Sequence, residues 1–166
     1  MARDTKLKRL GRLSAAIGVL LLVVIGLAVA YRKSIGSYRQ SAFVEAALRG
    51  NIPRMRLLLA AGANVDQPAC ESFLCPPPIV AAALADEPDA VDLLLNCGAN
   101  VNKSSMRGQT ALMVAAGKGR ANTVKLLIAK GADVNAVSEE GTALQRAKRT
   151  GHFDVAELLV KAGAAN

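Results

Sequence analysis

Cysteine has the clearest chemical options in this chain, because two of the three cysteines lie close together. Four residues separate Cys70 from Cys75, and a run of three prolines, 76–78, follows them directly. The pair allows a disulfide, which persists in oxidising compartments, or two free thiols in a reducing one. A zinc site would need more ligands than this stretch supplies, so no metal site is predicted.

The single histidine, His152, gives no sign of catalysis. A catalytic histidine needs a nucleophile and an orienting partner within reach, and nothing at suitable spacing supplies them. The Gly-Lys-Gly run at 117–119 lacks the flanking pattern of a phosphate-binding loop. The acidic cluster that starts at Asp86 is typical of the first turn of a helix. We therefore predict no catalytic residue, no cofactor, no metal and no small-molecule substrate, and we expect that the protein is not an enzyme.

Positive charge is concentrated at the start of the chain. The formal net charge is +8, and residues 1–12 hold five Lys or Arg residues against one acidic residue, Asp4. We predict that these twelve residues form a basic cytoplasmic N-terminus. Aromatic residues make up 3% of the chain and there is no Trp, so no basic helix face alternates with aromatic side chains. Nucleic acid is therefore not an expected partner.

An uncharged stretch of nineteen residues, 13–31, follows this basic start. As a helix rising about 1.5 Å per residue it would span roughly 28 Å, close to the hydrocarbon thickness of a bilayer. We predict a transmembrane helix that serves as a signal anchor, followed by a linker over residues 32–40. The alternative is a signal peptide cleaved near Ala30, after the small residues of Ala28-Val29-Ala30, which would release a soluble periplasmic protein.

The flanking Lys and Arg residues set the predicted orientation of that helix. Five precede the apolar stretch, whereas three follow it, at Arg32, Lys33 and Arg39. This imbalance keeps the N-terminus in the cytoplasm and sends the rest of the chain across the membrane. The small size, abundant alanine and short loops are typical of a bacterial protein. We therefore expect a single-pass inner (plasma) membrane protein whose larger part lies in the periplasm.

A spacing that recurs four times organises the chain after residue 40. Each interval joins two positions twelve residues apart and carries three consecutive aliphatic residues at the same offset. The intervals run over residues 50–62, 86–98, 119–131 and 151–163. Such self-similarity indicates a solenoid of stacked units. The connections between the intervals vary in length, so insertions are expected in connecting fingers rather than in helices.

The third unit shows the pattern most clearly. Thr110 is a plausible N-cap for a short helix, in which Leu112 and the pair Ala115-Ala116 form the apolar stripe. A second helix is predicted from about residue 122 to residue 129. Gly131 then stands where a left-handed C-terminal cap belongs.

Together these residues resemble the ankyrin repeat. The shared features are G-x-T-x-L at Gly108–Leu112, paired alanines in the first helices and Leu-Leu-Leu-x-x-Gly-Ala blocks in the second. The resemblance covers residues 41–166 and implies an all-α fold, in which a transmembrane helix precedes a solenoid of about four helix pairs joined by β-hairpin-like fingers. The predicted units are residues 41–66, 67–102, 103–135 and 136–166. The first helix of the last unit is expected to turn a polar face, Gln145, Arg146, Lys148 and Arg149, to solvent.

The resemblance also implies a function, because partners of ankyrin repeats dock on hairpin tips and on the concave face of the first helices. We expect a protein partner of unknown identity, bound by a membrane-anchored protein–protein interaction module. The residues expected at the finger tips are Met106, Arg107, Ser138 and Glu139. Those expected to line the groove are Met113, Lys118, Gln145 and Lys148. The module would act as an inhibitor or immunity protein, or alternatively as a scaffold that tethers an envelope enzyme.

Overall fold

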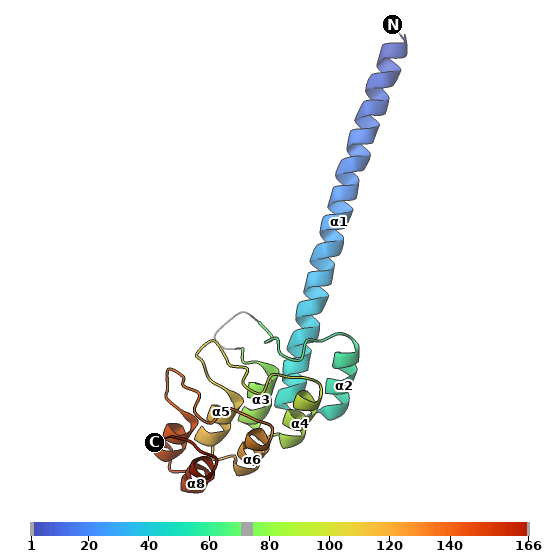
Figure 1. Cartoon of the computed structure of the whole chain (residues 1–166). Coiled ribbons are helices and arrows are strands. Elements are labelled where there is room, and N and C mark those ends of the chain that lie inside the picture. Colours follow the sequence, from blue (N-terminus) through green and yellow to red (C-terminus); the bar gives the residue numbers. More distant parts are fainter. Residues whose placement is uncertain (1, 71–74, 166) are drawn as a thin grey trace. The chain divides into compact units, whose positions relative to one another are not determined.

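Eight helices make up the described part of the chain (Figure 1). The computed structural model describes residues 2–70 and 75–165, with side chains from Leu21 onward. The helices are α1 (Ala2–Leu48), α2 (Ile52–Ala60), α3 (Pro78–Ala85), α4 (Pro88–Asn96), α5 (Ala111–Gly117), α6 (Ala121–Ala129), α7 (Ala143–Arg149) and α8 (Phe153–Lys161). These residues contain no regular strand. The β-structure of their fingers is limited to two isolated backbone bridges, Ser104 with Thr110 and Ser138 with Gly141. The all-α prediction is confirmed for this part of the chain.

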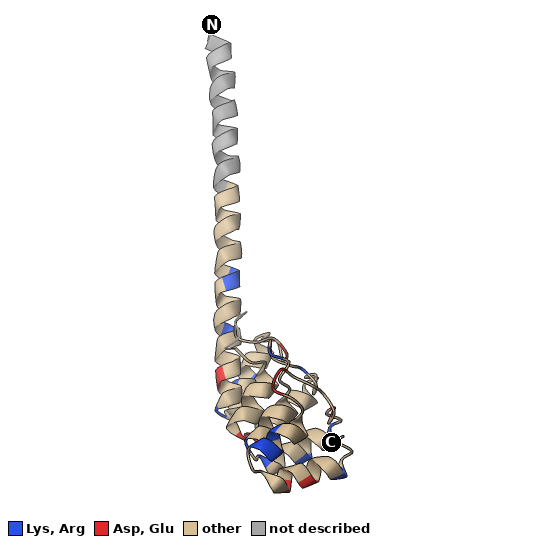
Figure 2. Cartoon of the chain, turned by 90° about the vertical axis from the view of Figure 1, so that its left-hand side faces the viewer, with Lys and Arg blue, Asp and Glu red and all other residues tan. Residues whose placement is uncertain are grey.

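The chain divides into two compact units, Met1–Ser37 and Tyr38–Asn166. The backbone of the first unit is part of one uninterrupted helix, α1, and the stretch predicted as a linker, residues 32–40, is helical as well. Among the described residues, Leu21–Leu48 is the one stretch long and apolar enough to cross a membrane, by length and composition. Figure 2 shows no charged residue at the described start of this stretch, and in the sequence the first charged residues after Leu21 are Arg32 and Lys33. The side chains of residues 1–20, which include the predicted basic terminus, lie outside the described ones.

The second unit is built from two rows of helices (Figure 1). Helices α3, α5 and α7 pack one on the next and form the first-helix row, whereas α2, α4, α6 and α8 form the second-helix row. Each first helix also packs on the second helix that follows it. The end of α1 supplies the first helix of the first pair, since Phe43, Ala46 and Ala47 belong to the same core cluster.

Alanine pairs allow the first helices to approach closely. The members of the three pairs are between 0% and 1% exposed: Ala46-Ala47, Ala82-Ala83 and Ala115-Ala116. Ala147 continues this seam in α7 and is also fully buried. A methyl group fills the space between two close backbones, and a longer side chain would push them apart. The predicted apolar stripe of the third unit is therefore confirmed.

The middle residue of each aliphatic block secures the second-helix row. Leu94, Leu127 and Leu159 are all fully buried in α4, α6 and α8. Burying a leucine side chain stabilises a fold by roughly 1.5–3 kcal/mol. The first unit differs, because its middle residue, Leu58, is only partly buried and Met55 provides the fully buried side chain of α2.

Helix ends follow the local sequence. The Thr110 hydroxyl accepts a hydrogen bond from the Met113 amide, as predicted for an N-cap, and Thr142 caps α7 in the same way. Gly131 has a φ of 83°, which confirms the left-handed position after α6. Asp86 is the one described non-glycine residue with a positive φ, at 63°.

Asp86 uses its strained position to join two units. Its carboxylate accepts a hydrogen bond from the Thr123 hydroxyl at 3.0 Å and lies 3.5 Å from Arg120 Nη1. Both partners belong to the next repeat. A glycine would relieve the backbone strain but would lose these contacts.

A ladder of amide and carboxylate side chains joins the fingers. Asp66, Asn102 and Asn135 each accept a hydrogen bond from a backbone N–H one repeat further along, at 3.0, 2.8 and 2.7 Å. The donors are the amides of Asn100, Asp133 and Ala165. These bonds explain why an Asn or Asp recurs at the end of each Ala-x-Val-x block: it satisfies a donor that the loop leaves unpaired.

Candidate protein-binding surface

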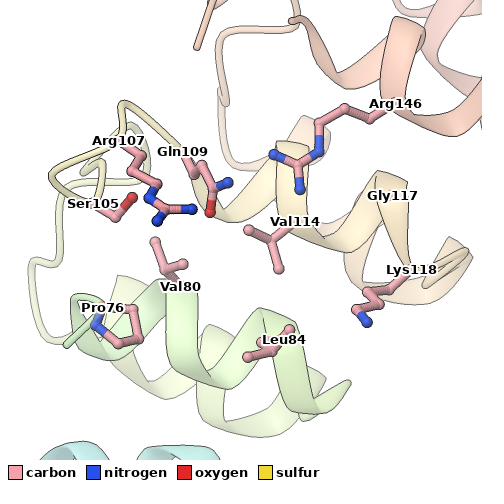
Figure 3. A pocket seen from close by; sticks show the side chains of 10 residues that line it. All are labelled: Pro76, Val80, Leu84, Ser105, Arg107, Gln109, Val114, Gly117, Lys118 and Arg146. Carbon is pink, nitrogen blue, oxygen red and sulfur yellow. The ribbon is translucent and has the colours of Figure 1, made fainter. Parts of the chain in front are cut away.

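A pocket of about 300 Å³ opens on the first-helix row, beside the finger that precedes α5 (Figure 3). Residues of α3, α5, α7 and this finger line it, so it is contained within the second unit. We call it the first-helix pocket. Its lining residues are Pro76, Val80, Leu84, Ser105, Arg107, Gln109, Val114, Gly117, Lys118 and Arg146. A volume near 300 Å³ is at the small end of the range for ligand pockets, which suits one or two side chains of a partner.

The charge of the first-helix pocket has one sign. Its lining includes three cations, Arg107, Lys118 and Arg146, and no carboxylate. Arg107 and Lys118 are exposed, and neither forms an ion pair with any described residue. Apolar side chains from α3 and α5, among them Val80 and Val114, form the opposite wall (Figure 3). The pocket therefore combines positive charge with an apolar surface.

Arg146 lies on α7 but covers α5. Its side chain is 13% exposed, and its Nε atom lies 3.2 Å from the place that a Cβ on Gly117 would occupy. In the neighbouring first helix, α3, the residue aligned with Gly117 is Leu84. The missing side chain on Gly117 is thus the local reason why the guanidinium lies against α5 and the space beside it stays open.

Two polar atoms of this lining have no hydrogen-bond partner. Arg146 Nη1 and Ser105 Oγ are both buried, and no acceptor or donor among the described residues reaches them. A buried polar group without a partner costs about 1–3 kcal/mol.

One carboxylate lies close to the pocket but is shared among several donors. Glu140 accepts a hydrogen bond from Gln109 Nε2 at 2.7 Å. Its Oε2 atom lies 3.4 Å from Arg146 Nη2 and 3.9 Å from Arg149 Nη2. Because two guanidinium groups share this one carboxylate, positive charge remains in excess. Glu140 also fixes the orientation of Gln109 and Arg146.

Six of the eight residues predicted to contact a partner are exposed; five of them lie on or near this surface, and the sixth is Gln145. Met106 and Arg107 are exposed on the finger before α5, and Glu139 is exposed on the next finger. Lys118 lines the pocket, and Lys148 is exposed on α7. Only Arg107 and Lys118 of these reach the pocket itself.

Two further predicted contacts carry structural roles. The Ser138 hydroxyl donates to Gly141 O at 2.9 Å and accepts from the Glu140 amide, so it holds the tip of its finger. Gln145 accepts a hydrogen bond from the Thr142 amide and thereby completes the capping box of α7. Ser138 is half-buried and Gln145 is exposed, but the Ser138 hydroxyl and the Gln145 Oε1 atom are used by the fold.

The prediction that Met113 lines the groove is wrong. This side chain is 1% exposed, because it belongs to the core cluster that joins the stacked first helices. The expectation of a solvated polar face on α7 also fails at Arg146, which lies against α5. Sequence reasoning missed Arg146 as a pocket residue, although its alignment opposite a glycine one repeat earlier could have indicated a folded-down side chain.

The cysteines and the histidine serve neighbouring parts of the fold. Cys70 and Cys75 are joined by a disulfide, so the chain that leads directly to Pro76 at the rim of the pocket is covalently closed. The His152 ring lies against Gly119 of the preceding unit, where an added Cβ would come within 2.5 Å of Nδ1. This packing is a structural contact between repeats.

Comparison with known proteins places these features in a wider group. A family model described as ankyrin repeats, in three copies, matches residues 79–166. The "Ankyrin repeat and KH domain-containing protein mask-1" of Caenorhabditis elegans is 32% identical over 130 residues, which cover 75% of this chain and 5% of that protein. The E3 ubiquitin-protein ligase KEG of Arabidopsis thaliana is 35% identical over 129 residues, which cover 75% of this chain and 8% of that protein. The chain thus spans less than a tenth of the length of either relative.

Proposed function

Because this chain belongs to the ankyrin repeat family, we propose that its helix pairs bind a protein partner while α1 anchors them to a membrane. Ankyrin repeats imply a protein–protein interaction module. The contact surface we propose is the first-helix row together with the finger tips. The observation that carries this choice is the first-helix pocket, a hollow with unpaired charges on a surface that the stacking of repeats does not use.

A site-specific photo-crosslinking experiment tests this surface. A photoreactive phenylalanine analogue replaces Met106, which is 59% exposed on a finger, or Leu57, which is 70% exposed on the second-helix row. Both positions present an exposed apolar side chain, so they differ chiefly in which surface they report. We expect a discrete crosslinked protein from the Met106 position and none from Leu57. Equal crosslinking from both positions, or crosslinking from Leu57 alone, would contradict the proposed surface.

The second part of the proposal is the location. We propose a single-pass inner-membrane protein with residues 1–12 in the cytoplasm and the repeats in the periplasm. The support is the uncharged stretch of residues 13–31 and the excess of Lys and Arg before it. The alternative, a soluble periplasmic protein cleaved near Ala30, rests on the small residues at that point.

Cys97 provides a direct test of location, because it is exposed and outside the disulfide. A membrane-impermeant maleimide is added to cells with a permeabilised outer membrane, and a Cys97→Ser variant serves as the blank. We expect labelling of Cys97 in whole cells. Labelling only after lysis would place the repeats in the cytoplasm, and a mature mass reduced by the first thirty residues would establish cleavage instead of anchoring.

Within this function we favour an inhibitor or immunity protein that neutralises an envelope enzyme. A scaffold that tethers such an enzyme to the membrane is the alternative. The two differ in the consequence of deletion: loss of an immunity protein harms the cell only while a neighbouring toxin is active. Loss of a scaffold instead lowers the activity of the tethered enzyme and leaves survival beside an active toxin unchanged.

A further inference from the structure

We propose that the first-helix pocket binds an acidic side chain of the partner, presented next to an apolar one. This inference rests on the proposed function, since it assumes a protein partner on this surface. It adds the chemical class of the segment that the pocket recognises: a short peptide stretch in which Glu or Asp lies beside an aliphatic residue.

The charge distribution of the second unit singles out this pocket. From Tyr38 to Asn166 the sequence has fourteen Lys and Arg residues and twelve Asp and Glu residues, which is nearly balanced. Yet the pocket lining contains three cations and no carboxylate. Several cations elsewhere have carboxylate neighbours; Lys130, for example, lies 2.7 Å from Asp92. An anion in this pocket would meet positive charge that the protein itself leaves uncompensated.

The geometry favours a carboxylate on a peptide over a nucleic acid or a membrane surface. Nucleic acids and anionic membranes are bound by extended basic surfaces, whereas here the charge is confined to one small hollow. The pocket also has an apolar wall of Val80, Leu84 and Val114, which an isolated phosphate ion would leave uncovered. A carboxylate beside an aliphatic side chain satisfies both parts of the lining.

Each cation has a distinct part in this recognition. Arg146 is nearly buried and held by Glu140, so it presents a guanidinium whose position is fixed before binding. Arg107 and Lys118 are exposed and unpaired, and they would close on the ligand from the finger and from the end of α5 (Figure 3). One cation held in place, together with two exposed cations, would select a charged side chain without requiring one particular conformation of the peptide backbone.

The test measures peptide binding to the full chain in uncharged detergent micelles by fluorescence anisotropy. The probe is a fluorescein-labelled Gly-Leu-Glu-Leu-Gly peptide with blocked ends, compared with its Gln and Lys analogues. We expect the Glu peptide to bind at least about tenfold more tightly than the Gln peptide, because a charge-assisted hydrogen bond is lost. Affinity should also fall as the salt concentration rises.

Two variants with a matched control locate the site. Arg107→Gln with Lys118→Gln removes the two exposed cations of the pocket, and Arg56→Gln with Lys125→Gln removes two exposed, unpaired cations of the second-helix row. We expect the first pair to weaken the Glu peptide by about tenfold and the control pair to change it by less than about twofold. Gly117→Leu fills the pocket and displaces the Arg146 guanidinium, whose Nε lies 3.2 Å from the new Cβ, and should abolish binding while the circular dichroism spectrum shows that the helices remain.

Several outcomes would overturn the proposal. These are equal affinity for the Glu and Gln peptides, no binding of the Glu peptide at about 1 mM, or equal losses in the pocket and control variants. Displacement of the peptide by inorganic phosphate at the same concentration as by acetate would also do so, because it would show an unselective anion site. If the Arg107→Gln, Lys118→Gln variant still crosslinks the partner from position 106, the interaction module stands and the acidic-pocket inference alone falls.

Discussion

The two rows of helices differ in how much of each helix is buried when the repeats stack. In the first-helix row six of the eight residues of α3 and six of the seven residues of α5 are buried. In the second-helix row the corresponding numbers are four of nine in α4 and three of nine in α6. Helix α5 is enclosed by α3, by α7 and by its own second helix, whereas α7, which ends the row, has three of seven residues buried and the second helices keep a broad solvated face.

This difference indicates on which row an exposed residue is informative about binding. Exposed positions of the second-helix row are numerous, so the exposure of Lys125 or Leu57 says little about a binding role. In α3 and α5 few positions keep any exposure, and two of them, Leu84 and Gly117, line the first-helix pocket together with Lys118, which directly follows α5. A charged residue on the first-helix row therefore lies among positions that must mostly be small and apolar for the repeats to stack.

The largest expected effect comes from the buried leucine of the second-helix row. Leu127→Ala removes a fully buried side chain and should lower the free energy of unfolding by about 3 kcal/mol, through lost burial and the cavity left behind. Lys125→Ala, on the exposed face of the same helix, should change it by less than about 0.5 kcal/mol. Urea denaturation followed by circular dichroism measures both. Similar losses in the two variants would show that α6 does not have one buried and one free face.

A bulky residue at the alanine pairs should show most clearly that the two rows differ in their tolerance of larger side chains. Ala115→Leu inserts three carbon atoms between first helices that are in contact, at a position that is 0% exposed, and should cost about 2 kcal/mol. Ala129→Leu makes the same change at an exposed position of α6 and should be nearly neutral. The melting temperatures of the two variants give the comparison. If the seam tolerates leucine as well as the exposed position does, close packing is not what limits the first helices.

Two glycines distinguish backbone strain from contact between units. Gly119 and Gly131 both have positive φ, at 70° and 83°, but only at Gly119 would an added Cβ meet a neighbour, the His152 ring. We expect Gly131→Ala to cost about 1 kcal/mol and Gly119→Ala about 2 kcal/mol, measured by urea denaturation. In a His152→Ala background the two glycine substitutions should become equally costly. A difference that persists in that background would mean that the ring is not the cause.

The smallest expected effect concerns pH and the second-helix row. Lys130, which directly follows α6, donates a hydrogen bond to Asp92 of α4 and holds the pKa of that carboxyl below its ordinary value. Because the folded-state pKa is lowered, the pair stabilises the fold fully above the unfolded pKa, and this contribution is lost as the pH falls through the folded pKa. Lys130→Gln should therefore raise the pKa of Asp92, observed by carboxyl carbon NMR.

A pair within one helix provides the control for that titration. The pKa of Glu157 is lowered by its hydrogen bond with Lys161, four residues later in α8. Lys130→Gln should leave the Glu157 titration unchanged. A parallel rise at both sites would point to a general change of charge rather than to the contact between α4 and α6.

The sequence alone determined the features that depend on local chemistry and on the period of the repeat. Thr110 caps its helix, Gly131 takes the left-handed conformation, and the alanine pairs are buried, all as the residue types predicted. Each of these outcomes requires only a few neighbouring residues or a repeat of known spacing. The family followed from the same evidence, because four copies of one pattern constrain a fold far more strongly than one copy does.

The tertiary structure decided which side of a two-turn helix remains open. Met113 and Arg146 illustrate this: the first was expected in the groove and is buried, and the second was expected in solvent and lies against α5. A helix of seven residues has too few positions for its own periodicity to define a buried face. The neighbouring repeats define that face instead, and a single absent side chain, on Gly117, determines where a guanidinium settles and where a pocket opens.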